Sequence, residues 1–599
     1  MFTTRPEITG TFGVTTSTHW LATAVGMSLL ERGGNAFDAC VAAAFTLQVV
    51  EPNLVGPAGE APAIFHSVST GKIEVLCGQG TTPADATLDH YRAQGLSLIP
   101  GNGLLSTVVP GAFDAWMILL RDHGTRSLRD VLEPAIHYAE HGHPVLERVS
   151  DTIAVLQEFF ETYWPSSAAV YLPNGSAPQP GTLFRNPALA RTWIRLLAEA
   201  ESVGGDRERQ IEKARDVFYR GFVAEAIDKF VRGTEAMDES GSPHRGVLSG
   251  ADMAAWSASY EAPVRYRYGD ITVSKAGPWS QGPAFLQTLA LLRHTDIAEL
   301  KRGDPRFVHL LMEAMKLAFA DREAYYGDPD FVDVPLAHLL SDDYSRARAA
   351  LIGEQASTLL RPGVVPGYEA QAGRVNAALD RLSSLKPDGV ATSALERIGR
   401  MVSARKGDTT HVDVIDRWGN MISATPSGGW LQSSPVVPGL GFGLNTRAQM
   451  FWLEEGLPCT LQPRKRPRTT LSPTLLQRNG EPWMAFGTPG GDQQEQWQLQ
   501  LFLRHVHQGM NLQEAIDAPM FYTQHFPSSF YPRDRRPASL TIERDFGADA
   551  LNDLKRRGHV VEESPEWSIG RLTAASRDPD GLLHAAASPR LVQAYAAGR

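Results

Sequence analysis

Apolar and polar residues alternate in two short runs that lie close together in the last third of the chain. The first run spans residues 411–415 and the second spans residues 421–425, and Arg417-Trp418-Gly419-Asn420 between them favours a turn. Alternation with a period of two is typical of half-buried strands, so the two runs predict a β-hairpin. Thr409 and Thr410 stand immediately before its first strand.

Helical spacing of apolar residues dominates the regions around this hairpin. Apolar positions three and four residues apart predict helices at 20–31 and 36–50, with Gly33-Gly34-Asn35 ending one and starting the next. The same reasoning predicts a hairpin at 63–68 and 73–77, mainly helices over 104–200, one strand at 266–274, helices at 284–293 and 305–324, and a strand at 483–486 followed by a helix from about 493. Residues 355–405 are irregular and charged, as expected of an exposed processing segment.

Composition narrows the classes of protein to consider. The chain has 599 residues, which is long enough for two packed layers with insertions or for two domains. Hydrophobic residues make up 43% of it, and its formal net charge is -10. That charge gives no bias toward nucleic acid or anionic membranes, so neither is an expected partner. Three cysteines without CxxC spacing argue against a disulfide framework or a structural zinc site. The N-terminus lacks a basic start with an apolar core, and no run of about 18 apolar residues occurs, so a soluble, cytoplasmic protein is expected.

The Thr pair is a candidate nucleophile. Gly407-Asp408 before it is turn-prone, so a cut between Asp408 and Thr409 would leave Thr409 as an N-terminal residue at the start of a strand. A free α-amine has a pKa of roughly 7.7 to 8, so it can act as the base for its own Thr hydroxyl. The alternative is that both residues are β-branched strand filler.

A candidate anion-binding site lies where the strand at 483–486 ends in Gly487-Thr488-Pro489-Gly490-Gly491-Asp492. A strand, a Gly-rich turn and a helix start gather backbone N–H groups that can hold an anion or a developing oxyanion. The Lys-Ser/Thr ending of a phosphate loop is missing. The pairs His411 with Asp413 and His505 with His507 lack a third ligand at diagnostic spacing, so no metal and no cofactor are predicted.

Several blocks in one order give a resemblance to a known family. They are Gly33-Gly34-Asn35-Ala36-Phe37-Asp38-Ala39, Ala320-Asp321-Arg322, Gly327-Asp328-Pro329-Asp330-Phe331, Thr409-Thr410-His411, Asp416-Arg417-Trp418-Gly419-Asn420, Pro467 to Thr474, Gly487-Thr488-Pro489-Gly490-Gly491 and Ala587-Ser588-Pro589-Arg590. Together they span nearly the whole chain, which resembles the γ-glutamyltransferase family.

The resemblance implies an N-terminal nucleophile hydrolase with an α+β fold, a four-layer αββα sandwich. It implies a precursor that cuts itself before Thr409 into a large piece (1–408) and a small piece (409–599), which stay together as a heterodimer. Thr409 then attacks a small-molecule amide, Ser427 supports its hydroxyl, and the N–H groups of Gly490 and Gly491 stabilise the oxyanion.

The implied substrate pocket departs from the family pattern. Gln79 stands where an Arg is usual, Gly429 where an Asn is usual, and Met450 where an Asp is usual. The implied substrate-binding residues are Gly429, Thr410, Thr469, Thr470 and Arg447, and Arg447 provides a guanidinium suited to a carboxylate.

These departures leave open which acyl group the substrate carries. The sequence predicts an amidohydrolase or acyltransferase for γ-glutamyl or related small carboxyacyl amides, and the alternative is an acylase for a glutaryl, cephalosporin-type or oxamate amide. A short segment at 452–464, in place of the family's lid loop, favours hydrolysis over transpeptidation. An uncut scaffold or binding protein is the non-enzymatic alternative.

Overall fold

Two seven-stranded sheets form the centre of the protein. The computed structural model describes residues 3–384 and 409–599. The first sheet, here the β12 sheet, has the order β21 (Tyr595–Gly598), β2 (Gly13–Ser17), β12 (Val412–Asp416), β13 (Met421–Ala424), β3 (Ala63–Ser67), β4 (Lys72–Cys77) and β9 (Ser259–Glu261). The second, the β15 sheet, has the order β1 (Ile8–Gly10), β20 (Leu583–Ala587), β19 (Thr573–Arg577), β15 (Glu481–Gly487), β14 (Thr474–Arg478), β11 (Ile271–Lys275) and β10 (Val264–Tyr268). All neighbouring strands in both sheets are antiparallel.

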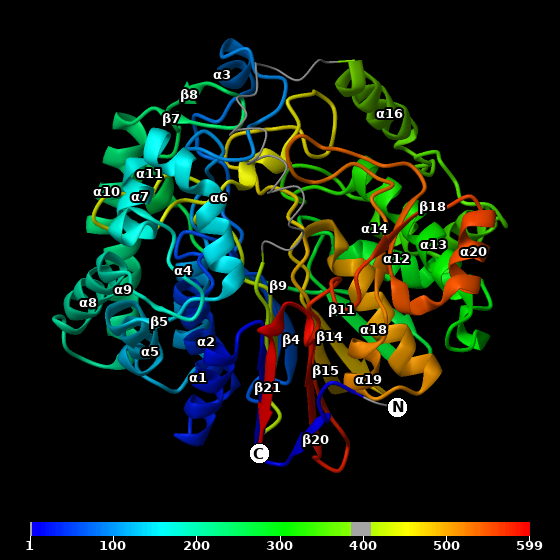
Figure 1. The fold of residues 1–599 in the computed structure, drawn as a ribbon, viewed down its shortest axis with the longest axis horizontal. Coiled ribbons are helices and arrows are strands. Elements are labelled where there is room, and N and C mark those ends of the chain that lie inside the picture. The colour runs from blue at the N-terminus through cyan, green and yellow to red at the C-terminus, as the bar shows by residue number, and fades with distance from the viewer. Residues whose placement is uncertain (1–2, 385–408) are drawn as a thin grey trace.

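The two sheets pack against each other and carry helices on their outer faces (Figure 1). Between them lies an apolar layer to which Ile415 and Met421 contribute from one sheet and Leu475 and Ala485 from the other. Helices α1 (Trp20–Glu31) and α2 (Ala36–Val50) cover the β12 sheet, and α12 (Gly282–Leu292), α13 (Pro305–Tyr325) and α18 (Gln494–Gln508) lie on the side of the β15 sheet. The predicted αββα sandwich is therefore confirmed.

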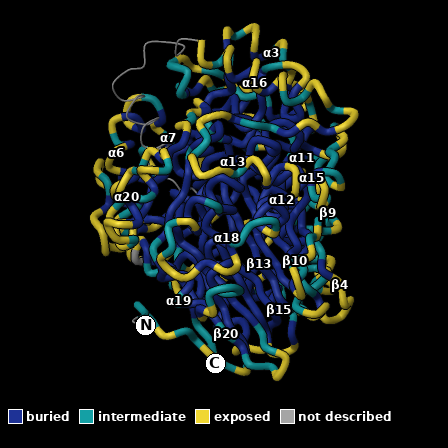
Figure 2. The backbone as a smooth tube through the Cα atoms, turned by 90° about the vertical axis from the view of Figure 1, so that its right-hand side faces the viewer, coloured by how far each residue is buried: buried dark blue, intermediate teal, exposed yellow. Residues whose placement is uncertain are grey.

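The remaining helices surround these four layers. They are α3 (Leu88–Ala93), α4 (Ala112–His123), α5 (Leu128–His141), α6 (Glu147–Tyr163), α7 (Pro165–Tyr171), α8 (Pro187–Glu201), α9 (Arg207–Tyr219), α10 (Phe222–Gly233), α11 (Gly250–Ala255), α14 (Leu336–Leu339), α15 (Asp342–Ala349), α16 (Glu369–Ser384), α19 (Leu512–Asp517) and α20 (Ala548–Arg556). A small sheet joins β16 (Phe521–Tyr522), β17 (Ser539–Glu543) and β18 (Val560–Ser564). Across residues 3–384 and 409–599, no helix has the length and apolar character needed to cross a membrane. Figure 2 shows that the exposed segments lie around the outside, while β13, β15 and α18 are largely buried.

Most elements around the Thr pair follow the sequence prediction. The hairpin of β12 and β13 is confirmed, as are α1 and α2, and Asn35 starts α2 with a capping box to Asp38. The single strand predicted at 266–274 is wrong: the chain reverses at Gly269, whose φ of +63° suits a tight turn, and forms β10 and β11. Residues 369–384 form α16 rather than irregular chain, and the rest of the predicted processing segment, 385–408, lies outside the described residues.

Both sheets combine strands from before and after residue 408. In the β12 sheet, β12 lies between β2 and β13, so a strand of the C-terminal part is hydrogen-bonded to one of the N-terminal part. In the β15 sheet, β11 of the N-terminal part pairs with β14 of the C-terminal part. A chain break at residue 408 would leave all of these pairings in place.

Candidate active site

Thr409 lies three residues before the first residue of β12, Val412, and is 2% exposed. It forms an antiparallel bridge with Ser427, and the Thr409 Oγ1 to Ser427 Oγ distance is 3.1 Å. The next residue, Thr410, donates from both its backbone N–H (3.0 Å) and its hydroxyl (2.8 Å) to the carbonyl of Pro426. Its hydroxyl is thus used to hold the strand. These contacts fix Thr409 between two backbone segments with its hydroxyl beside that of Ser427.

Behind Thr409, polar side chains continue along the face of the hairpin that is directed at the β15 sheet. Strand alternation places every second residue on this face. We call the set the hydroxyl ladder, and its members pair across the two strands as Thr409 with Ser427, His411 with Thr425, and Asp413 with Ser423. Ile415 and Met421 occupy the same face at the far end, where the ladder gives way to the apolar layer.

His411 is the centre of the hydroxyl ladder and is fully buried. Its Nδ1 lies 2.9 Å from Thr425 Oγ1 and its Nε2 lies 2.8 Å from Asp413 Oδ1. The other carboxylate oxygen of Asp413 accepts from Thr16 (3.1 Å) and Thr573 (2.6 Å). Buried polar groups require such partners, so the ladder forms a satisfied network below the candidate nucleophile.

Gly487, at the end of β15, shows how closely the second sheet approaches the hydroxyl ladder. A Cβ atom there would lie 2.2 Å from the imidazole Cε1 of His411. In addition, Ser423 donates to the carbonyl of Phe486 over 3.1 Å. The Gly-rich turn that follows β15 therefore leaves the sheet directly beside the ladder.

A buried ion pair contacts the other side of Ser427. Arg447, in the short 3-10 helix Arg447–Met450, donates from Nε to Glu60 Oε2 (2.8 Å) and from NH2 to Ser427 Oγ (2.7 Å). Burial raises the pKa of Glu60, and the charge of Arg447 opposes that rise. Gly429 has a φ of +65° and packs on the backbone of Gly59, so it serves the close approach of two loops.

Gly490 and Gly491 follow β15 at the entrance to α18, with φ of +131° and +55°. Among the described residues, no acceptor is recorded for either backbone N–H. A Cβ on Gly490 would lie 2.2 Å from the ring of Trp497, so only glycine fits there. Two backbone N–H groups at a helix entrance, with no acceptor in the described part of the chain, suit an anion or oxyanion.

Thr469 is linked to this turn through the loop before α12. It pairs with Ser280, and the neighbouring Gln281 donates to the carbonyl of Gly491 over 3.0 Å. Thr470 is buried, and its hydroxyl has no partner among the described residues. These two Thr residues therefore lie in the segment that joins the loop before α12 to the glycine turn.

Two aromatic rings connect the glycine turn to the Thr409 side of the site. A Cβ on Gly491 would lie 3.0 Å from Phe530, whose ring centroid is 6.4 Å from that of Trp430. The guanidinium of Arg447 lies 5.2 Å from the centroid of Trp430. Gly491 and Arg447, both predicted from sequence, thus lie against one aromatic pair.

Sequence reasoning missed Glu60 and Gln281. Glu60 is a carboxylate inside the mostly apolar, Gly-rich stretch 54–64, and a charge in such a stretch is a signal that it has a buried partner. Gln281 has no comparable signal, because only the fold brings it to Gly491.

No group of three or more metal-ligating side chains capable of holding a metal ion occurs among residues 3–384 and 409–599. All three cysteines are buried and unpaired, and burial raises the pKa of Cys77 to about 12. The described part of the site therefore consists of hydroxyls, amides, backbone N–H groups, the pair of His411 with Asp413 and the ion pair of Glu60 with Arg447.

Comparison with known proteins places this arrangement among hydrolases. The profile of the gamma-glutamyltranspeptidase family matches residues 22–598. The chain is 31% identical to the glutathione hydrolase-like YwrD proenzyme of Bacillus subtilis, covering 98% of each, and 29% identical to the oxamate amidohydrolase proenzyme of Klebsiella pneumoniae, covering 97% of each. Among solved structures, LmbA2991HD is 54% identical with a TM-score of 0.91 over 100% of both chains. The cephalosporin acylase from Bacillus halodurans is 26% identical with a TM-score of 0.82, covering 100% of this chain and 98% of the other.

Proposed function

The chain belongs to the gamma-glutamyltranspeptidase family and is an amidohydrolase, and from that premise we propose that Thr409 is its nucleophile, working through an acyl-enzyme. The observation that carries the proposal is the position of Thr409 just before the central strand β12, where it bridges to Ser427 with the two hydroxyl oxygens 3.1 Å apart.

The first proposed step is self-cleavage. Thr409 Oγ1 attacks the carbonyl carbon of Asp408, a residue outside the described ranges, and the C–N bond breaks to leave an ester and a free α-amine. Water then hydrolyses the ester, giving the Asp408 carboxylate and an N-terminal Thr409. The products are residues 1–408 and 409–599, which the shared sheets would keep together.

The second proposed step is amide turnover. The new amine has a pKa of roughly 7.7 to 8, so it can accept the hydroxyl proton as Thr409 attacks and deliver it to the leaving amine. The N–H groups of Gly490 and Gly491 stabilise the oxyanion, and losing one such donor costs about 3 to 4 kcal/mol of transition-state stabilisation. Water then releases the acyl group as an acid.

The acyl pocket is assigned to Arg447, Thr469, Thr470 and Gly429. An acyl group other than γ-glutamyl is a second candidate, because Gln79 and Met450 are neutral and buried, and Glu60 already compensates the charge of Arg447. The relatives named as an oxamate amidohydrolase and a cephalosporin acylase support that candidate. The three unpaired cysteines support a reducing, cytoplasmic setting.

Gel electrophoresis under denaturing conditions tests the proposal. Wild-type protein should separate into two bands of about two thirds and one third of its mass, whereas Thr409→Ala should remain one chain without amide turnover. An uncut, inactive wild type would instead support the scaffold alternative. Mass spectrometry of the acyl-enzyme, formed with γ-glutamyl, glutaryl and oxamate amides, identifies the acyl group.

A further inference from the structure

Glu60 is linked to the candidate nucleophile through Ser427, which bridges to both residues, although 349 positions separate Glu60 from Thr409 in the sequence. It belongs to the N-terminal part of the chain, whereas Arg447, Ser427 and Thr409 belong to the C-terminal part. The Glu60 and Arg447 side chains are 0% and 2% exposed, so the pair is shielded from solvent. An ion pair in such a place strongly fixes the direction of both side chains, because either partner alone would be a buried uncompensated charge.

The backbone holds this pair in register with Ser427. Glu60 N–H donates to the carbonyl of Ser427 over 2.8 Å, and Ser427 N–H donates to the carbonyl of Glu60 over 3.0 Å. Gly428 follows with a φ of +77°, and a Cβ there would lie 2.2 Å from Glu60 Oε2. Glycine at this position is therefore what allows the carboxylate to reach Arg447.

A chain of hydrogen bonds connects Arg447 to the nucleophile through Ser427. A guanidinium only donates, so Ser427 Oγ accepts from Arg447 over 2.7 Å. Its own proton is then polarised by the positive charge, and Thr409 Oγ1 lies 3.1 Å away. A hydroxyl polarised in this way stabilises negative charge as it develops on its neighbour.

Resting on the proposed role of Thr409, we propose that Glu60 is a positioning residue for the reaction: it holds Arg447 against Ser427 and thereby sets the hydrogen bond received by the Thr409 hydroxyl. The N-terminal part thus contributes to the reaction centre after cleavage, although it does not contain the nucleophile. Glu60 Oε1 and Arg447 Nη1 have no partner among the described residues, so the pair can form further hydrogen bonds beside Ser427.

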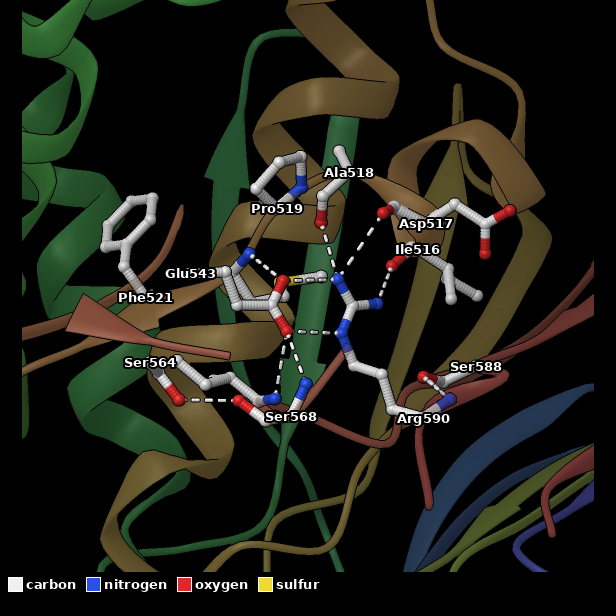
Figure 3. Close-up of polar contacts among 12 residues, drawn as sticks. Ile516, Asp517, Ala518, Pro519, Phe521, Glu543, Ser564, Ser568, Ser588 and Arg590 are labelled. Atoms are coloured by element: carbon white, nitrogen blue, oxygen red, sulfur yellow. Dashed lines mark hydrogen bonds and ion pairs between the residues drawn. The ribbon is translucent and has the colours of Figure 1, made fainter. Parts of the chain in front are cut away.

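The matched control is a second buried ion pair, that of Arg590 with Glu543 (Figure 3), for which no contact with the hydroxyl ladder is found among the described residues. Arg590 donates to both carboxylate oxygens of Glu543 over 2.9 and 2.7 Å, with side-chain exposures of 1% and 2%. The Arg590 guanidinium also donates to backbone carbonyls at the end of α19, including that of Ile516 at 2.8 Å, and lies over the ring of Trp567. Glu543→Gln therefore disrupts a buried pair of the same kind without touching Ser427.

The test compares kcat and KM for one amide substrate in Glu60→Gln, Glu60→Asp and Glu543→Gln, each corrected for the folded fraction. Glu60→Gln should lower kcat roughly tenfold to hundredfold, since the Ser427 hydroxyl is displaced, and it should also raise KM, since Arg447 belongs to the proposed acyl pocket. Glu60→Asp retains the charge and should give an intermediate kcat. Glu543→Gln should lower the melting temperature and leave kcat per folded molecule unchanged.

A double-mutant cycle with Ser427→Ala completes the test. If Glu60 acts through Ser427, Glu60→Gln should have little further effect on kcat once Ser427 is Ala. An equal loss in both backgrounds, or a Glu60→Gln kcat within twofold of wild type, would overturn the proposal. If Glu60→Gln does not fold, Glu60→Asp takes its place in the cycle with the same criterion. Failure of the proposed function looks different, because Thr409→Ala would then still turn over the amide.

Discussion

Replacing Asp413 by Asn removes a negative charge from between the two sheets while almost preserving the size of the side chain. The Asp413 carboxylate is fully buried and is the common acceptor for His411, Thr16 and Thr573. An ionised carboxylate only accepts, so His411 Nε2 donates to it. The substitution therefore tests whether the hydroxyl ladder depends on this one acceptor.

The expected loss in the free energy of unfolding follows from the number of groups that donate a hydrogen bond to Asp413. An Asn oxygen in place of Oδ2 would still accept from Thr16 and Thr573, but the amide NH2 would then face His411 Nε2–H. One buried donor without a partner costs about 1 to 3 kcal/mol, and the two hydroxyl bonds lose the contribution of the charge. The free energy of unfolding should therefore fall by about 2 to 5 kcal/mol.

Urea unfolding in the Thr409→Ala background, where the proposed mechanism keeps the chain uncut, measures this difference. The control is Asp416→Asn, because Asp416 is also buried on β12 but accepts from Ala36 N–H (2.9 Å) and Asn420 at the opposite end of the strand. With Thr409 present, Asp413→Asn should slow chain cleavage more than Asp416→Asn does at equal folded fraction. If the free energy of unfolding fell by less than about 0.5 kcal/mol, the role of Asp413 as acceptor for three donors would be refuted. If Asp413→Asn and Asp416→Asn were cleaved at equal rates, the position of Asp413 in the hydroxyl ladder would not matter for cleavage.

Three further substitutions test other parts of the site. Gly490→Ala would place a Cβ 2.2 Å from Trp497, so kcat should fall at least about a hundredfold as the oxyanion donors move; a normal kcat in steady-state kinetics would remove this turn from the mechanism. Gly428→Ala should reproduce the kcat loss of Glu60→Gln, since the new Cβ would displace the Glu60 carboxylate, and a wild-type kcat would contradict that. Burial raises the pKa of Glu51 from 4.5 to about 7. The protonated form of Glu51 therefore stabilises the fold fully below pH 4.5, by at most about 3 kcal/mol, and this contribution is lost as the pH rises through 7. Glu51→Gln should therefore gain stability relative to wild type between pH 5 and pH 8 in thermal melts, and a constant difference would show that Glu51 does not titrate there.

Local patterns were sufficient for the central elements of the fold. The period of two in the hairpin and the capping box at Asn35 are short-range features, and β12, β13 and α2 follow from them. The single strand predicted over 266–274 failed for a local reason too: Gly269-Asp270 is a tight turn inside a run of β-forming residues, and the propensity of its neighbours concealed it.

Residues of the candidate site could be predicted only where they lie on sequence segments that resemble the family's motifs. Thr409, Ser427 and Arg447 were predicted from the C-terminal part, and the structure places them in one hydrogen-bonded chain. Glu60 could not be assigned to that chain, because its contact with Arg447 spans 387 positions and arises only when the loop before β3 packs beside the end of β13. Pairings of this range are set by tertiary packing, on which a single sequence carries little information.

The same long-range pairings explain how a chain break before Thr409 is compatible with a fixed nucleophile. β12 is held on one side by β2 of the N-terminal part and on the other by β13, and at its far end Asp416 accepts from the first N–H of α2. None of these contacts runs through the peptide bond at residue 408. The strand is therefore positioned before any cut and remains positioned after it. In the proposed mechanism the N-terminal part therefore folds around β12 before the Thr409 amine is freed, because contacts such as that of Glu60 with Arg447 exist only in the assembled fold.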